Sequence, residues 1–516
     1  MKGGSLLDKI IETYDTTLRY ATFEGSEGVK LEERLAIIRT LDSMGITYID
    51  IGTPDTSEEY DRFLKQALEL PLESAVLTPF IRAKDCGRRI GMEPVVLKIL
   101  EMDAQTVCVE GECSEYVIRD EGKMRLEENL WQISQVISWF RSRGKSVIFN
   151  AHNFFDALSS SSAYTREVIK TASSAGADRI VLCDSSGYAL FHDITAGIDV
   201  ARMQHTRRIG IQCANSSGCA DSNAVVAAKS GVMHIQGSFL GTGPNGNISL
   251  AVTIANLQIS MGYSCIPYMK LNRLTHAAEY IADQMDVSVP PAMPYVGRLA
   301  FAEEIPMIPN SRSANMVHPE VVGNSRQMNL MTSYALTVLI ERMNKMGYKV
   351  TRDLITSLDL WKEYHRGYAT EVSIALQILR GLGKVNSVFV IQDVKVLSER
   401  IKGSDYDRTH VMMESTLAGE KRYSSGSGSD IVEAFWEAVQ EAVADKIKSV
   451  RNIRINSIRG RAMSRSEFSA VLDVTNGERA WSVSAVEPTE LRCLCSMACD
   501  VIDYQLLMLG FYREKK

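Results

Sequence analysis

The stretch SVIFNAHNFFDALSSSSAYTREVIKTASSAGADRIVLCDSSG, residues 146–187, decides the fold that this chain is predicted to adopt. It begins and ends with short, largely apolar runs, SVIFNAH at 146–152 and RIVLCDS at 179–185, which are typical of strands buried on both faces. Gly176 stands just before the second run, where the C-terminal end of a helix favours a left-handed residue. The stretch is therefore predicted to form a strand, a helix and another strand.

The same pattern repeats through the first half of the chain. The other six apolar runs are IETYDTT at 11–17, TYIDIG at 47–52, SAVLTPF at 74–80, TVCVEG at 106–111, RIGIQCAN at 208–215 and VMHIQGSF at 232–239. Eight strand–helix units in roughly 250 residues are typical of a closed (β/α)8 barrel. A doubly wound sheet is the alternative, but the first turn has no G-x-G-x-x-G sequence. We therefore predict a (β/α)8 TIM barrel over residues 1–264.

Two further regions follow the predicted barrel. Residues 265–390 lack strand periodicity and are expected to form a helical linker region. Residues 391–516 combine strand runs with helices and are expected to form an α+β domain. Within that domain the stretch SSGSGSD at 424–430 precedes a helical pattern, so it is expected to be a functional turn at a helix N-terminus, able to bind a small effector, or a structural turn.

Composition excludes several classes of protein. The chain has 516 residues, of which 45% are hydrophobic and 23% charged, and its formal net charge is −6, without a long basic run. A nucleic-acid groove is therefore not expected. The ten cysteines form no C-x-x-C pair, which favours reduced thiols, and no apolar stretch is long enough to span a membrane. These features predict a soluble, cytoplasmic protein without membrane contact.

Active sites of such barrels lie at the C-terminal ends of the strands. The polar residues at these positions are Asp15, Arg19, Asp50, Arg82, Glu110, Glu112, Asn150, His152, Asp184, Gln212 and Asn215.

Several of these residues belong to stretches that resemble the 2-isopropylmalate, homocitrate and citramalate synthase family, most closely its citramalate synthase branch. The stretches are DTTLR at 15–19, YIDIGTP at 48–54, NAHNFFD at 150–156, VLCDSSG at 181–187, IQCANSSG at 211–218, QGSFLGTGPNGN at 236–247, PYVGRLAFA at 294–302 and HPEVVGNSRQ at 318–327. The resemblance runs from about residue 11 to residue 510. It implies a TIM barrel with a C-terminal regulatory and dimerisation domain, and a role in amino-acid biosynthesis.

The family condenses acetyl-CoA with a 2-oxo acid, and the resemblance implies a divalent cation that polarises the ketone. Several positions depart from that pattern. Tyr20 replaces the metal-binding aspartate after Arg19, Gln212 and Ala214 replace two imidazole ligands, and Leu240 replaces an asparagine. An amide is a poor donor to such a cation, and alanine and leucine offer none. We therefore predict that the chain holds no metal and no resident cofactor.

Further along, FAEEIPMI at 301–308 replaces a segment with two histidines, and Ala314 stands where a tyrosine is expected. The chain is accordingly predicted to be a catalytically degenerate or regulatory paralogue, a pseudoenzyme candidate of the acyltransferase class. One alternative is remodelled, metal-independent chemistry on acyl-CoA or 2-oxo acid ligands, and another is a genuine acyltransferase with an unrecognised metal site. The expected partners are a second copy of the chain or an active paralogue, and an acyl-CoA, 2-oxo acid or amino-acid effector.

Two residues are the catalytic candidates of the remodelled enzyme. Arg19 either clamps a ligand carboxylate or forms an ion pair with Asp15 or Asp50, and His152, expected near Asp184, either transfers protons or is a structural hydrogen-bonding histidine.

The remaining candidates are ligand-binding. Asp15, Asp50, Asp184 and Asn215 are expected to line the mouth of the barrel, while Gly241 and Gly243 are expected in a loop that binds the phosphate end of CoA. Cys183 and Cys213 are expected to be buried filler rather than nucleophiles.

Overall fold

The structure is a computed structural model that divides into two compact units, residues 1–300 with 321–323 and residues 301–320 with 324–516. It describes residues 10–20, 29–55, 57–87, 89–205, 208–297, 299–303, 317–324, 327–329, 368–399, 408–464, 467–476 and 480–509. Much of the predicted helical linker, including residues 304–316 and 330–367, lies outside the described residues, so the three-part division of the chain stays a prediction.

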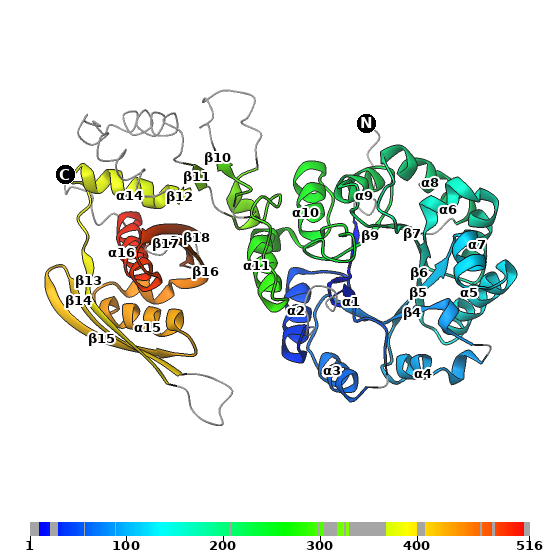
Figure 1. Ribbon diagram of the computed structural model, residues 1–516, viewed down its shortest axis with the longest axis horizontal. Coiled ribbons are helices and arrows are strands. Elements are labelled where there is room, and N and C mark those ends of the chain that lie inside the picture. The colour runs from blue at the N-terminus through cyan, green and yellow to red at the C-terminus, as the bar shows by residue number, and fades with distance from the viewer. Residues whose placement is uncertain are drawn as a thin grey trace. The chain divides into compact units, whose positions relative to one another are not determined.

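The first unit is the predicted barrel (Figure 1). Its parallel sheet has the strand order β3-β2-β1-β9-β8-β7-β6-β5-β4. The strands at the two ends of this order, β3 (Val76–Thr78) and β4 (Phe80–Arg82), are consecutive in the chain and are divided by Pro79, which has no N–H to donate to a ladder. Together they form one interrupted strand, so the nine strands of the sheet correspond to the eight predicted runs. The other strands are β1 (Glu12–Asp15), β2 (Tyr48–Asp50), β5 (Thr106–Glu112), β6 (Ser146–His152), β7 (Arg179–Asp184), β8 (Arg208–Cys213) and β9 (His234–Gly237).

Helices surround these strands (Figure 1). Each helix has one apolar face, which packs against the sheet. In α5 (Leu126–Arg141), Ile133, Val136, Ile137 and Phe140 are fully buried, whereas Trp131 lies on the opposite face and is exposed. The helices are α1 (Thr17–Tyr20), α2 (Leu31–Met44), α3 (Glu58–Leu68), α4 (Pro94–Glu101), α5 (Leu126–Arg141), α6 (Phe154–Ser160), α7 (Ser162–Ser174), α8 (Phe191–Gln204), α9 (Ala220–Lys229), α10 (Leu250–Ala255) and α11 (Leu274–Gln284). The last of these falls in the predicted linker but packs against α2.

A buried carboxylate joins the strands at the N-terminal end of the barrel. Glu12, the first residue of β1, accepts hydrogen bonds from Nε and Nη2 of Arg179 at 2.5 and 2.8 Å and from Nη1 of Arg208. Nδ1 of His234 lies 3.4 Å from the same carboxylate. Burial alone would raise the pKa of Glu12, but the contacts with Arg179 and His234 outweigh burial and lower it well below its usual range. The carboxylate thus links β1 to β7, β8 and β9.

Replacing Glu12 by glutamine should destabilise the barrel by about 3 kcal/mol, because the largely buried guanidinium of Arg179 and the half-exposed guanidinium of Arg208 lose their common counter-charge. Urea unfolding followed by circular dichroism measures the change. The matched control is Glu167→Gln, which removes a half-exposed carboxylate from α7 and should change stability by less than about 0.5 kcal/mol. Equal effects of the two substitutions would contradict the role given to Glu12.

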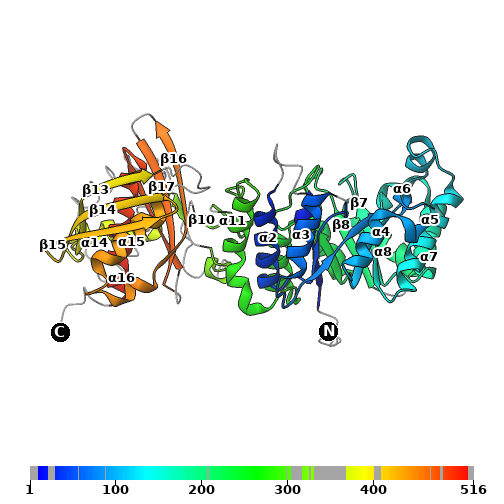
Figure 2. The ribbon, with the colours of Figure 1, turned by 90° about the horizontal axis from the view of Figure 1, so that it is seen from below.

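The second unit contains the same motif twice, three antiparallel strands followed by a helix (Figure 2). The helices and the inner faces of both sheets contribute to one hydrophobic core, with Phe435, Trp436 and Trp481 among its large side chains. The first copy consists of β13 (Phe389–Glu399), β14 (Arg408–Leu417), β15 (Glu420–Gly428) and α15 (Ile431–Val443), and the second of β16 (Arg454–Ser464), β17 (Glu467–Thr475), β18 (Ala480–Glu487) and α16 (Glu490–Met508). Before them stand a small sheet, β10 (Ala302–Glu303), β11 (Gln327–Asn329) and β12 (Tyr368–Thr370), and helix α14 (Glu371–Gly381).

The predicted glycine-serine turn is wrong. Residues 424–428 belong to β15 and pair with β14 through Met413↔Ser424 to Thr409↔Gly428. The small residues serve packing, since a Cβ on Gly426 would lie 2.0 Å from the carbonyl oxygen of Ala434 in α15. The glycines therefore let a helix lie directly on the strand.

The outer edge of β15 is covered by carboxylates from α15. Three outward-pointing backbone N–H groups, two near the end of the strand and one just after it, each bind one glutamate. The pairs are Ser425 with Glu441 at 2.6 Å, Ser427 with Glu437 at 2.6 Å and Ser429 with Glu433 at 2.8 Å. The spacing of four residues on the helix matches the spacing of two residues on the strand, so one helix face satisfies three successive donors at this end of the strand edge.

Gly426→Ala should destabilise the second unit by at least about 2 kcal/mol, because the added methyl group forces α15 away from the sheet. Ser427→Ala on the exposed side of the same strand is the control and should be nearly neutral. Thermal unfolding of both variants checks this, and a neutral Gly426→Ala would contradict the close helix–strand contact.

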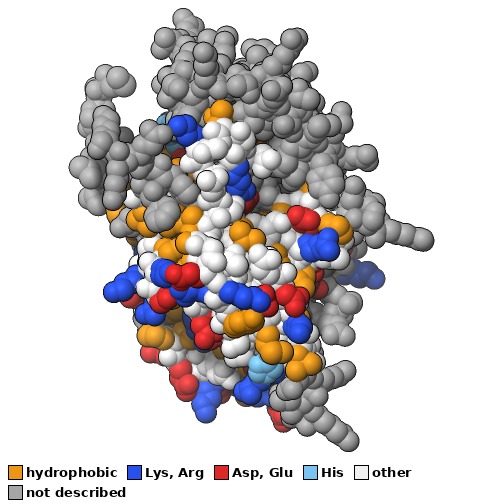
Figure 3. Space-filling model, turned by 90° about the vertical axis from the view of Figure 1, so that its left-hand side faces the viewer, with side chains coloured by type: hydrophobic (Ala, Val, Ile, Leu, Met, Phe, Trp, Pro, Cys, Tyr) orange, Lys and Arg blue, Asp and Glu red, His pale blue; other side chains and the backbone are white. Residues whose placement is uncertain are grey.

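The outer face of sheet β13-β14-β15 carries exposed Leu397, Met412 and Tyr423. The face of the molecule in Figure 3 mixes acidic, basic and hydrophobic side chains. Among the described residues, no helix combines the length and the apolar character needed to cross a membrane.

Candidate functional site at the C-terminal end of the barrel

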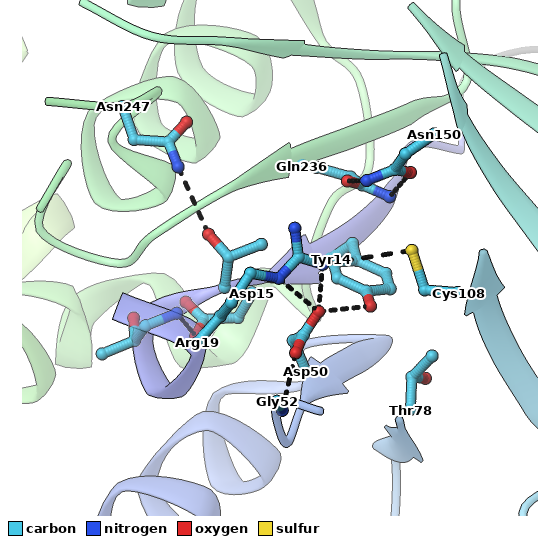
Figure 4. A network of polar contacts seen from close by, with 12 residues as sticks. Tyr14, Asp15, Arg19, Asp50, Gly52, Thr78, Cys108, Asn150, Gln236 and Asn247 are labelled. Carbon is cyan, nitrogen blue, oxygen red and sulfur yellow. Dashed lines mark hydrogen bonds and ion pairs between the residues drawn. The ribbon is translucent and has the colours of Figure 1, made fainter. Parts of the chain in front are cut away.

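An ion pair occupies the centre of the barrel mouth (Figure 4). Arg19 donates to Oδ2 of Asp50 through Nη2 and, at 2.9 Å, through Nε. The Tyr14 hydroxyl donates to the same oxygen at 2.7 Å, while the N–H of Gly52 donates to Oδ1 at 2.8 Å. The guanidinium also lies 4.0 Å above the ring of Phe80. Of the alternatives left open for Arg19, the structure therefore contains the ion pair with Asp50, and contact with a ligand stays a prediction.

Asp15 lies beside this pair and is completely buried. Its Oδ1 accepts from the N–H of Thr17 at 2.8 Å, but its Oδ2 has no hydrogen-bond partner. Burial raises the pKa of Asp15 to about 7, against the smaller opposing effect of the hydrogen bonds from Thr17. The side chain therefore carries a proton through much of the range below neutrality.

Amide groups fill the neighbouring positions. Asn150 and Gln236 exchange two hydrogen bonds, at 2.9 and 3.1 Å, across the barrel (Figure 4). Gln212 donates to Asn247 at 3.4 Å, and Asn247 donates to Thr16 at 3.3 Å. Each of these amides is thus engaged with another side chain.

A second histidine-carboxylate contact lies away from the barrel centre, at the ends of β5 and β6. His152 and Glu112 are register partners in these parallel strands, and Nδ1 of His152 lies 3.0 Å from Oε2 of Glu112. The N–H of Ser114 donates to Glu112 at 2.8 Å, and the amide of Asn153 donates at 3.1 and 3.2 Å. The carboxylate that His152 contacts is therefore Glu112, while proximity to Asp184, at the end of the adjacent strand β7, stays a prediction.

These contacts shift both pKa values. Burial would lower the pKa of His152, but the hydrogen bond with Glu112 and the charges of Glu110 and Glu112 raise it above its usual value. Burial would raise the pKa of Glu112, but the contact with His152 lowers it below its usual value. The pair therefore favours a negatively charged Glu112 beside a readily protonated imidazole.

The pair lines a cavity of about 400 Å³. Arg82 and Lys84 line it from the end of β4, and Val117, Ile118 and Met124 supply apolar surface from the segment after β5. Nε of Arg82 donates to Oε1 of Glu110 at 3.3 Å. Cationic, apolar and acid–base groups therefore meet in one cavity that is open to solvent, the kind of site at which small molecules bind. We call it the β5–β6 cavity.

The other predicted ligand-binding residues support loops. Asp184 accepts from the N–H groups of Gly187 and Ala189 at 3.0 and 3.2 Å, and burial raises its pKa against these hydrogen bonds. Asn215 accepts from the N–H of Ala220 at the start of α9 at 3.1 Å. A direct role in ligand binding stays a prediction for both.

The predicted phosphate loop closes on itself. Gly241 and Gly243 have positive φ angles of 75° and 139°, as the tight loop requires. The N–H groups of Gly241, Gly246 and Asn247 donate to carbonyl groups within the loop. Phosphate binding there stays a prediction.

The barrel cysteines are buried. Burial raises the pKa of Cys183 and Cys213 well above the usual value and that of Cys108 to about 12. All three therefore remain thiols near neutral pH and pack as small apolar groups.

The residues at the barrel mouth do not fit the divalent cation that the family resemblance implies. The Asp50 carboxylate is bonded to Arg19, Tyr14 and the Gly52 N–H, and Gln212 is a neutral amide. Ala214 and Leu240 are buried and have no donor atoms, and the part of the chain that the structure describes holds no cluster of three His, Cys, Asp or Glu side chains suited to a metal. The described residues do not include Ala314 or most of the stretch 301–308, and the side chain of Tyr20 is not described. That the chain takes no metal stays a prediction.

Sequence reasoning noted Glu112 and Arg82 only as strand ends and did not single out Lys84. A signal existed, because Glu112 and His152 are the last residues of adjacent strands and therefore meet in register.

A parallel barrel with polar residues at its C-terminal end defines this chain as one of the TIM-barrel proteins. It belongs to the HMGL-like family, whose model matches residues 10–281. It is 26% identical to an (R)-citramalate synthase of Aquifex aeolicus, over 96% of this chain and 97% of the relative. It is also 26% identical to an (R)-citramalate synthase of Synechocystis, over 96% of each chain, and 23% identical to a probable 2-isopropylmalate synthase of Methanopyrus kandleri, over 92% and 95%. The predicted family resemblance is confirmed.

The pKa of Asp15 predicts a pH dependence of stability. Because the folded state keeps this proton up to about pH 7 and the unfolded state releases it near 3.8, stability should fall as pH rises between these values, by about 4 kcal/mol in total. Asp15→Asn, which mimics the protonated acid, should remove that dependence. Urea unfolding at pH 5, 6, 7 and 8 checks this against Asp199→Asn, which alters an exposed carboxylate. If Asp15→Asn showed the same dependence of stability on pH as the wild type, the assignment of this dependence to Asp15 would be contradicted.

Proposed function

We propose that this chain keeps the scaffold of the citramalate and isopropylmalate synthases but does not catalyse their metal-dependent condensation. The supporting observation is the state of Asp50: the acidic side chain at the centre of the mouth is bonded to Arg19, Tyr14 and the Gly52 N–H. A cation would have to displace an arginine that neutralises this carboxylate within a buried site. Without the cation the condensation loses several kcal/mol of transition-state stabilisation, because the cation is the Lewis acid that offsets the charge on the developing alkoxide.

The role that we propose is regulatory or structural. The two copies of the three-strand and helix motif in the second unit share one continuous core, which supports a domain that folds as a unit, as the dimerisation domain implied by the family resemblance would. We propose a homodimer, or a heterodimer with an active paralogue, that responds to an acyl-CoA, a 2-oxo acid or an amino acid.

Two alternatives remain as proposals. A genuine acyltransferase would hold its metal through residues outside the described part of the chain. Metal-independent chemistry would use residues that are already in place, and the contact between His152 and Glu112 in the β5–β6 cavity favours it.

The test is release of CoA thiol from acetyl-CoA in the presence of pyruvate or other 2-oxo acids, with and without Mg²⁺ or Mn²⁺. We expect no metal-dependent release above the blank, and less than one equivalent of divalent metal per chain after purification. A bacterial citramalate synthase assayed in parallel is the positive control. Metal-dependent turnover by this chain would overturn the proposal.

A further inference from the structure

We propose that the β5–β6 cavity is a metal-independent acid–base site for a small oxo carboxylic acid, at which His152 exchanges a proton with the carbon next to the ligand's ketone. The proposal rests on the metal-independent alternative above and adds the site, the ligand class and the proton step. The centre of the mouth is filled by the ion pair of Arg19 and Asp50, whereas this cavity lies at the ends of β4, β5 and β6 and is open to a ligand.

The imidazole is held as a proton-transfer group requires. Glu112 fixes Nδ1 of His152 at 3.0 Å, and Ser114 and Asn153 hold Glu112 in place. Among the described residues, Nε2 of His152 has no protein partner, and the side chain is 38% exposed while lining the cavity. One ring nitrogen is therefore oriented by a carboxylate and the other is available to a ligand.

The same cavity offers positive charge for a carboxylate. Arg82 uses Nε on Glu110, and its two Nη atoms have no protein partner among the described residues. The ammonium group of Lys84 is equally without a partner in the described part of the chain. Glu121 also lines the cavity, so the attraction for an anion is confined to the side formed by Arg82 and Lys84. A guanidinium and an ammonium together suit a carboxylate and the charge that develops on a neighbouring carbonyl oxygen.

The remaining wall sets the size and polarity of the ligand. Val117, Ile118 and Met124 contribute apolar surface, and the cavity volume of about 400 Å³ accommodates an acid with a short carbon chain. An imidazole is too weak a base for an ordinary C–H bond, so the carbon must be acidified by an adjacent carbonyl group. An oxo acid meets both requirements.

The proton step is balanced without a co-reactant. Neutral His152 takes the proton through Nε2, the C–H electron pair forms a carbon–carbon double bond, and the carbonyl π pair moves to oxygen, which gives an enolate and an imidazolium. The reverse step returns a proton to the carbon, and in D₂O the proton returned is a deuteron. Because Glu112 and Glu110 raise the pKa of His152 against the effect of burial and of Arg82, the rate should rise with pH as the imidazole becomes neutral.

The experiment follows loss of the proton signal next to the ketone by NMR, in D₂O with EDTA, for two probes: 2-oxobutanoate and 4-oxopentanoate. We expect the protein to accelerate exchange in at least one of them, and His152→Gln to slow it about 100-fold. Glu112→Gln should move the pH profile to lower pH, an effect that a purely structural role would not produce. Lys84→Ala should raise the half-saturating concentration about tenfold, because the ligand carboxylate loses one of its two cationic partners.

Lys170→Ala is the control for Lys84→Ala, because it removes an exposed ammonium group from α7. Exchange no faster than in buffer with both probes, or exchange unaffected by His152→Gln in a folded variant, would overturn the proposal. Lys84 lies on the surface, so its variant remains informative if His152→Gln does not fold. The exchange assay contains no metal and no CoA. An absence of proton exchange therefore contradicts this proposal alone. Metal-dependent release of CoA would instead contradict the proposed loss of condensation activity.

Discussion

The contact between Arg19 and Asp50 determines what the mouth of this barrel can do. A guanidinium and a carboxylate that are both removed from water bind each other strongly, and a ligand gains access to one only by leaving the other unpaired. Tyr14 and the Gly52 N–H add further hydrogen bonds to the same carboxylate. The centre of the mouth is therefore a closed polar core, and the open space lies to one side, where β4, β5 and β6 end.

The barrel contains two histidine–carboxylate contacts, and the burial of each histidine decides the direction of its pKa shift. His234 is fully buried at the N-terminal end, and burial lowers its pKa even though Glu12 is close. His152 is partly exposed at the C-terminal end, and Glu112 outweighs burial and raises its pKa. The first contact belongs to a network that joins strands, while the second leaves a ring nitrogen facing a cavity. The same residue pair thus links strands at one end of the barrel and lines a cavity at the other.

The barrel could be predicted from the sequence because its strands are buried on both faces and therefore consist of apolar runs separated by helical spacing. Strand β15 could not, because its serine and glycine residues are typical of a turn. Those residues are small because α15 lies directly on them, a constraint visible only in three dimensions. The partner of His152 was also missed, since it depends on the register of β5 against β6 rather than on either strand alone. For Arg19, sequence narrowed the partners to Asp15 and Asp50, and geometry selected Asp50.

The glutamates along β15 have a consequence for assembly. The unpaired backbone groups of an exposed strand edge can form hydrogen bonds with a strand from another molecule, which is a common cause of aggregation. Here an incoming strand would have to displace three carboxylates that already hold the available N–H groups, and it would meet their negative charge while doing so. Sheet extension at this edge is disfavoured. A partner of the second unit would therefore bind at a different edge or surface, where side chains rather than these backbone N–H groups decide which partner fits.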